Sequence, residues 1–194
     1  MEKNILTKKS CRLLIIGGSA GSLEVLLHML PDVQPAISFA ILVVMHRGTE
    51  SDTLLPFLLS SKTSLPVKEA EEKEKIQPGT IYIAPADYHL LIEKDHTFSL
   101  DFSEKVNFSR PSIDVTFSVA AEAYGGELAC LLLSGGNTDG TEGLIFVKES
   151  GGAVAVQDPA SASMPFMPQS AISRLKPDHV LRPEEIASFI NNLS

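Results

Sequence analysis

The sequence has few cysteines and no long hydrophobic run, and both absences exclude classes of protein. Its two cysteines among 194 residues, Cys11 and Cys130, form no Cys-x-x-Cys pair, which gives little support to a metal or dithiol site. We expect two free, buried thiols in a cytoplasmic protein. The apolar run at 39–45 is far shorter than a membrane span, and the run at 13–16 ends too soon, at two glycines, for a signal peptide.

Positive charge is also scarce. Lys and Arg total 16 against 24 Asp and Glu, so the net charge is -8. A nucleic-acid-binding protein usually carries a basic face, and the only basic cluster here is Lys8, Lys9 and Arg12. We therefore expect no nucleic-acid partner and no membrane insertion. We interpret residues 1–10 as a flexible tail before a single domain at 11–194.

Apolar runs typical of strands alternate with amphipathic stretches typical of helices, which predicts an α/β fold. The expected class is a doubly wound, mostly parallel sheet with helices on both faces. A short antiparallel excursion is expected near 79–100, where turn residues are frequent. Strands are predicted at 13–16, 39–45, 79–84, 89–92, 127–133 and 153–156, and helices at 23–30, 53–60, 113–124, 140–149 and 183–193.

A serine lies in a Gly-x-Ser-x-Gly turn, residues 17–21, between the first predicted strand and the first predicted helix. This context is typical of a nucleophile whose hydroxyl is exposed at the end of a sheet. A dinucleotide loop is the alternative, but it requires Gly-x-Gly-x-x-Gly, and Ser19 and Ser22 stand where its second and third glycines belong. A turn with a purely structural role remains the third interpretation.

Three polar residues follow predicted strands, where ligands gather in open parallel sheets. Ser19, His46 and Asp139 supply a nucleophile, a base and a carboxylate, the set required for acyl transfer. His89, on a predicted turn, competes with His46 for the role of base. Asp139 has a second interpretation as a cap of the helix from Gly140. The chain order Ser, His, Asp differs from that of ordinary α/β-hydrolases.

These motifs, taken in order, resemble the catalytic domain of the chemotaxis protein-glutamate methylesterase family, the CheB family. The resemblance implies Ser19 as nucleophile, His46 as base and Asp139 as the carboxylate that orients it. The matching stretches are IGGSAG at 16–21, MH at 45–46, PVKEA at 66–70, PG at 78–79, YIAP at 82–85, RPSID at 110–114, LSGGNTDG at 133–140 and MP at 167–168 with Ala171.

The resemblance also implies an activity: hydrolysis of glutamate γ-methyl esters on the cytoplasmic helices of chemoreceptors, and deamidation of receptor glutamines, through an acyl-enzyme. It implies no metal or organic cofactor. Backbone amides would hold the oxyanion, with Ala20 as the first candidate. The residues expected to bind the oxyanion or substrate are Ala20, Gly18, Gly136, Arg110 and Met167.

Four positions depart from the family's usual residues. Ala20 stands where threonine is frequent, and Ser22, Asn137 and Phe166 stand where glycine is frequent. We expect Ala20 and Phe166, which sits near a predicted rim, to affect substrate preference more than reaction type. An esterase for another substrate therefore remains an alternative, as does a module that binds phosphate on the amides of residues 18–22.

The family usually carries a receiver domain that blocks its site until phosphorylated. With the catalytic domain starting near residue 11, we expect no receiver in this chain. Its activity would then be unregulated, or controlled by a separate receiver protein, or the sequence is a fragment.

Overall fold

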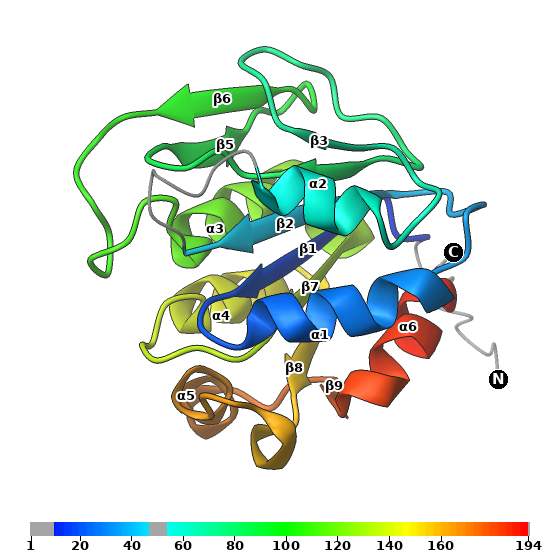
Figure 1. The fold of residues 1–194 in the computed structure, drawn as a ribbon. Coiled ribbons are helices and arrows are strands. Elements are labelled where there is room, and N and C mark those ends of the chain that lie inside the picture. The colour runs from blue at the N-terminus through cyan, green and yellow to red at the C-terminus, as the bar shows by residue number, and fades with distance from the viewer. Residues whose placement is uncertain (1–9, 47–53, 194) are drawn as a thin grey trace, which may run out of the picture.

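The computed structural model describes residues 10–46 and 54–193, so almost all of the predicted tail lies outside the described residues. Seven strands pair in parallel in the order β3-β4-β2-β1-β7-β8-β9 (Figure 1). Two further strands, β5 (His89–Ile92) and β6 (Phe98–Asp101), form a separate antiparallel pair. The parallel strands are β1 (Leu13–Gly18), β2 (Ala40–Met45), β3 (Val67–Glu69), β4 (Ile81–Ile83), β7 (Leu128–Leu132), β8 (Ala153–Gln157) and β9 (His179–Leu181).

Helices cover both faces of the parallel sheet (Figure 1). One face packs against α1 (Ser22–Met29), α2 (Leu54–Ser60) and α6 (Pro183–Asn191). The other packs against α3 (Ile113–Tyr124), α4 (Thr141–Glu149), α5 (Phe166–Arg174) and the β5–β6 pair.

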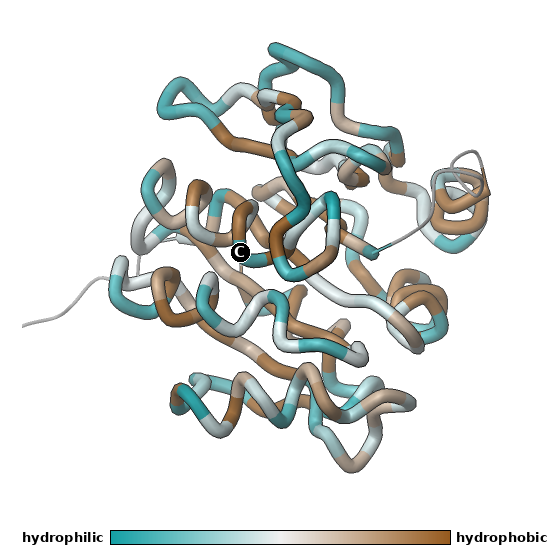
Figure 2. Tube along the Cα trace, turned by 90° about the vertical axis from the view of Figure 1, so that its left-hand side faces the viewer, coloured by the Kyte–Doolittle hydropathy of each residue, from teal (hydrophilic) through white to brown (hydrophobic). Residues whose placement is uncertain are grey.

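The side chains of β1 show why this sheet needs two helical layers. Leu14 and Ile16 belong to one hydrophobic core and Leu13 and Ile15 to the other, because successive side chains of a strand point to opposite faces. All four are almost completely buried. In the view of Figure 2, hydrophobic residues concentrate along the inner strands and hydrophilic residues at the outer turns. A strand buried on both faces is apolar throughout, which is why the sequence was informative here.

The predicted class is confirmed, but one part of the prediction was wrong. Strand β4 belongs to the parallel sheet, where Ile81 pairs with Ile41 of β2, so the antiparallel excursion is confined to residues 89–101. The short strands β3, β6 and β9 and helix α5 were not predicted, because three or four residues show too little periodicity and Pro168 interrupts the pattern of α5. Both cysteines are buried thiols outside any disulfide, as expected. No helix in the described ranges is long and apolar enough to cross a membrane.

Candidate active site

The three central strands, β2, β1 and β7, end side by side and bring together the residues that follow them. Gly18 pairs with Met45 in the β1–β2 register, so Ser19 and His46 leave adjacent strands at the same level. The His46 amide donates to the Gly18 carbonyl at 3.2 Å, and the Ser19 amide donates to the Ser134 carbonyl at 2.9 Å. The carboxyl edge of the sheet is thereby fixed as the site of Ser19, His46 and the loop that carries Asp139.

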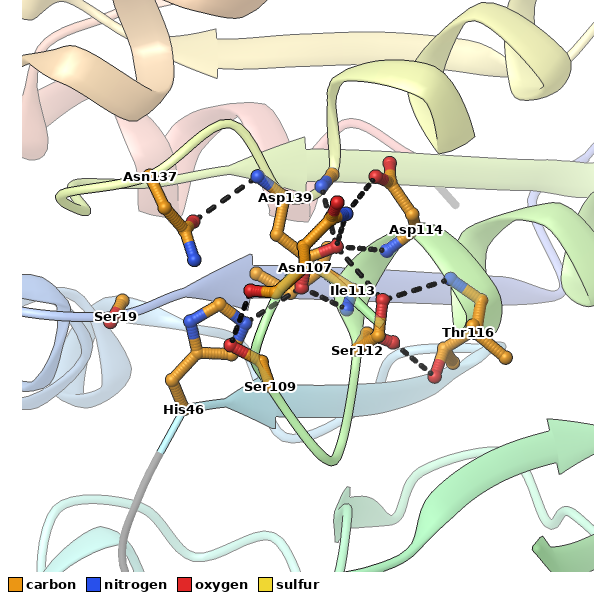
Figure 3. Close-up of polar contacts among 12 residues, drawn as sticks. Ser19, His46, Asn107, Ser109, Ser112, Ile113, Asp114, Thr116, Asn137 and Asp139 are labelled. Atoms are coloured by element: carbon orange, nitrogen blue, oxygen red, sulfur yellow. Dashed lines mark hydrogen bonds and ion pairs between the residues drawn. The ribbon is translucent and has the colours of Figure 1, made fainter. Parts of the chain in front are cut away.

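His46 and Asp139 form a close pair. The imidazole Nε2 lies 2.7 Å from Asp139 Oδ2, and the Asp139 carboxyl is completely buried. An ionised carboxylate only accepts hydrogen bonds, so Nε2 carries the proton and Nδ1 of the neutral ring is an acceptor. In Figure 3 this second nitrogen faces Ser19. The two ring nitrogens thus have the reverse of the roles they have in chymotrypsin-type triads.

The Asp139 carboxylate accepts an unusually complete set of hydrogen bonds (Figure 3). Besides His46, its donors are Asn107 Nδ2 at 3.0 Å, Ser112 Oγ at 2.8 Å and the amides of Ile113, Asp114 and Gly140 at 2.7, 3.0 and 3.2 Å. Burial by itself would raise the pKa of Asp139, but hydrogen bonds from His46, Asn107 and the start of α3 lower it to about 2. The carboxylate is therefore ionised at neutral pH.

The alternative in which Asp139 caps the helix after Gly140 does not hold. Gly140 is the N-cap of α4, and the free Gly143 amide in the first turn of that helix donates to Asp114, not to Asp139. Asp139 instead accepts hydrogen bonds from the free amides of Ile113 and Asp114 at the start of α3, 26 and 25 residues earlier in the chain. The positive end of that helix adds to the stabilisation of the charge.

The turn that carries Ser19 is tightly constrained. A Cβ on Gly18 would lie 2.2 Å from Ser22 Oγ, and Gly21 has φ 85°, so both positions require glycine. Ser22 Oγ accepts from the Ser19 amide at 3.1 Å and donates to the Ser134 carbonyl at 2.7 Å. Ser19 itself stays half-buried and Ala20 exposed, so the hydroxyl is open to a ligand. In the described part of the chain no hydrogen bond joins Ser19 Oγ to His46.

The other predicted ligand-binding residues take different positions. Gly136 is exposed beside Met164, 3.5 Å from where its Cβ would be. Met167 is completely buried and packs beneath Gly135, so its side chain supports the loop rather than facing solvent. The Arg110 guanidinium binds Asp87 at 2.7 Å and is stacked 3.9 Å from the Phe102 ring centre, which commits it to contacts within the chain.

His89 lies apart from the Ser19–His46–Asp139 group. It is the first residue of β5, not part of a turn, and it is 1% exposed. Its Nδ1 accepts from the Ser112 amide at 3.1 Å, so its Nε2 donates to the Glu104 carbonyl at 2.9 Å. These contacts hold a neutral ring against the backbone and give it a supporting place in the structure.

Sequence reasoning missed the polar residues that surround Asp139. Ser112 caps α3 through the Val115 amide and also donates to Asp139. Asp114 is buried beside Asp139, and its pKa is raised to about 6, first by burial and then by the Asp139 charge. The Asn107 amide lies between the two carboxyls. A loop asparagine and an acid in a first helical turn are too common to attract notice in a sequence. Among the described residues no His, Cys, Asp and Glu side chains cluster as metal ligands would.

Fold and site together define a doubly wound α/β protein with a serine, an imidazole and a buried carboxylate at the carboxyl edge of its sheet. The sequence model of the CheB methylesterase family matches residues 14–190. The chain belongs to the CheB methylesterase family, a family of carboxylic ester hydrolases, and the resemblance inferred from its motifs is confirmed.

Individual relatives agree with this assignment. The chain is 45% identical to the "Putative protein-glutamate methylesterase/protein-glutamine glutaminase" of Leptospira interrogans over 93% of both chains. It is 38% identical to the "Protein-glutamate methylesterase/protein-glutamine glutaminase" of Thermotoga maritima, and the match covers 89% of this chain and 51% of that relative. The crystal structure of the Thermotoga maritima CheB methylesterase catalytic domain superposes with a TM-score of 0.91 at 34% identity, covering 96% of this chain and 100% of that one.

Proposed function

We propose that this protein removes methyl groups from glutamate γ-methyl esters of chemoreceptors and also deamidates receptor glutamines, the two reactions for which its relatives are named. The observation that carries the proposal is the 2.7 Å contact between His46 and the buried Asp139, with the free ring nitrogen facing Ser19 (Figure 3). This arrangement can activate a hydroxyl, and a bare phosphate-binding loop would not need it.

Ser19 is the nucleophile in this mechanism. As its Oγ attacks the ester carbonyl, its proton passes to His46 Nδ1, and Asp139 stabilises the imidazolium that forms. The imidazolium then protonates the departing methoxide, which leaves as methanol, and Ser19 carries the acyl group. Water, deprotonated by Nδ1, attacks the acyl-enzyme, and the imidazolium returns the proton to Ser19 Oγ as the glutamate carboxylate leaves. With a glutamine substrate the same steps release ammonia.

Backbone amides at the exposed side of Ser19 would hold the oxyanion. The Ser19 amide is not available, because it donates to Ser134 O and Ser22 Oγ. The same bonds argue against a phosphate cradle on this loop. The Ala20 amide and the exposed Gly136 are the remaining candidates, and Met164 and Phe166, 44% and 53% exposed, form an apolar rim suited to a small methyl ester.

The test is covalent labelling combined with product analysis. A serine-reactive fluorophosphonate should modify Ser19 in the wild type and not in Ser19→Ala, and the wild type should release methanol from a methylated chemoreceptor. Asp139→Asn should lower turnover by about 10⁴-fold, since an amide can hold the imidazole in the wrong tautomer. Methanol release by a folded Ser19→Ala variant at the wild-type rate would refute the acyl-enzyme.

A further inference from the structure

Asn107 occupies a special position beside the proposed catalytic carboxylate. Its Nδ2 lies 3.0 Å from Asp139 Oδ1 and 2.8 Å from Asp114 Oδ2 (Figure 3). Both partners are carboxyl oxygens, so the nitrogen, not the oxygen, of the amide faces them. A primary amide has two N–H groups, and here each one points to a different acid. Lysine or arginine would add charge, and a hydroxyl has only one proton to give.

A strained turn holds this amide in place. Residues 106–109 form a two-residue hairpin, closed by hydrogen bonds of 3.2 and 2.9 Å between Val106 and Ser109. Both central residues have positive φ, 51° for Asn107 and 62° for Phe108. Asparagine tolerates this conformation, whereas a bulky residue such as phenylalanine is an outlier in it. The turn is exposed, with Phe108 98% accessible, so its Asn107 side chain covers the buried carboxyls from the solvent side.

Two buried acids in contact with one amide create an electrostatic problem. Asp139 must stay ionised to hold the imidazolium, and a second negative charge on Asp114 would oppose it. Apart from Asn107, the Asp114 side chain accepts only the Gly143 amide, at 2.7 Å, among the described residues. Asp139 keeps its donors from α3. Loss of the amide therefore leaves the two carboxyls facing each other without the donor they share.

We propose that Asn107 is a positioning residue, which covers the Asp139–Asp114 pair and gives one N–H to each carboxyl, so that Asp139 stays aligned with His46. The inference rests on the proposed function of Asp139. It assigns Asn107 a role that acts through that carboxylate and involves no contact with substrate.

The test compares two glycine variants of one turn. Asn107→Gly removes the amide and Phe108→Gly keeps it, and both accept positive φ. By analogy with partners behind metal ligands, Asn107→Gly should lower kcat for methanol release by about 10- to 100-fold, with KM changed less. The kcat of Phe108→Gly should stay within about two-fold of wild type, because no catalytic contact is lost. Equal kcat values for the two variants would overturn the proposal.

Asn107→Asp adds a second measurement, the pH dependence of activity, which a change in the stability of the turn would not alter. Protonated, the new carboxyl can donate one hydrogen bond to its neighbours, and ionised it repels both. The activity of Asn107→Asp relative to wild type should therefore rise several-fold as the pH is lowered from 8 to 6. Within residues 10–46 and 54–193, the charged or titratable groups that contact the amide are Asp139 and Asp114, with His46 beyond Asp139. A ratio that does not vary with pH would contradict the assignment.

Carbon NMR of the aspartate carboxyls tests the geometry without an activity assay. Burial is the largest cause of the raised pKa of Asp114, and the hydrogen bond from Asn107 opposes it, so removal of that donor in Asn107→Gly should raise the pKa further. An unchanged or lower value would show that the Asn107 amide does not hold the Asp114 carboxyl. If this titration shifts while the wild type releases no methanol, the proposed function fails and the structural role of Asn107 stands. If the wild type is active and Asn107→Gly equals it, only the inference fails.

Discussion

Ser134 and Ser19 are linked so that the loop after β7 holds the loop after β1. The Ser134 carbonyl accepts from the Ser19 amide at 2.9 Å, and the Ser134 hydroxyl donates to the carbonyl of the next residue, Ala20, at 2.7 Å. The same hydroxyl accepts from the Met164 amide at 2.9 Å, which adds the segment before α5. Three segments far apart in the sequence meet on this one buried side chain.

Replacing this hydroxyl should therefore affect both stability and catalysis. Ser134→Ala leaves the Ala20 carbonyl and the Met164 amide without their partner, at a cost of about 1–3 kcal/mol in the free energy of unfolding. Urea unfolding measures the loss, and kcat/KM should fall as the Ser19 turn loosens. Ser173→Ala is the matched control, because Ser173 is exposed and its hydroxyl donates to the Ser170 carbonyl within the same helix, α5. A Ser134→Ala protein as stable and active as this control would show that the Ser134 hydroxyl does not hold the Ser19 turn.

Alanine variants of the two histidines considered as base should differ in which property they lose, turnover or stability. His46→Ala should lower turnover by about 10⁴-fold or more while the protein stays folded. His89→Ala removes the hydrogen bonds to Ser112 and Glu104 and should cost about 1–3 kcal/mol of stability, with most of the kcat of the folded protein kept. Steady-state kinetics beside thermal unfolding distinguish the effects. The base would have to be reassigned if folded His89→Ala were inactive and His46→Ala active.

Asp114 should make stability depend on pH in a direction unusual for an acid. Its pKa is raised to about 6 in the folded protein, against about 3.9 for an unfolded aspartate. The protonated carboxyl therefore stabilises the fold fully below pH 4, and this contribution is lost as the pH rises through 6. The loss is on the order of 3 kcal/mol. Asp139, with its pKa lowered to about 2, has the opposite effect, gaining stability as the pH rises from about 2 to 4.

Urea unfolding of wild type and Asp114→Asn between pH 4 and 8 isolates this contribution. The difference in unfolding free energy, wild type minus variant, should fall between about pH 4 and 6.5 and level off above that range. Groups common to both proteins cancel in the difference. A flat difference over the whole range would mean that Asp114 titrates as an ordinary exposed carboxyl.

Glycine in place of two exposed phenylalanines should change stability in opposite directions. At Phe108, where φ is 62°, glycine removes left-handed strain of about 1–2 kcal/mol and adds chain entropy worth about 0.5–1 kcal/mol, a net gain. At Phe57, in the interior of α2, glycine costs about 0.5 kcal/mol or more. The residues are 98% and 68% exposed, so little buried area is lost at either. Thermal unfolding measures both changes, and a Phe108→Gly protein less stable than Phe57→Gly would show that Phe108 is not strained.

Local pattern was sufficient for the central elements and for the places of the candidate site residues. Strands β1, β2 and β7 were predicted because strands buried on both faces must be apolar throughout. The polar residues that follow them were then expected at one edge of the sheet, where the structure brings Ser19, His46 and Asp139 together. Their catalytic roles remain predictions. Strands β3, β6 and β9 lack this signal, since each has three or four residues and most of these are half-buried or exposed.

The sequence by itself determined the fold class, the family and the positions of Ser19, His46 and Asp139, since these depend on periodicity, glycine placement and motif order. Only the tertiary structure decided which nitrogen of His46 is hydrogen-bonded to Asp139. It also decided that Asp139 accepts hydrogen bonds from the first amides of α3 and does not cap α4. It also decided that Met167 and Arg110 support loops and that Asn107 bridges two acids. The physical reason is that such contacts depend on distances between side chains of separate elements, which the packing of two cores sets and no local pattern encodes.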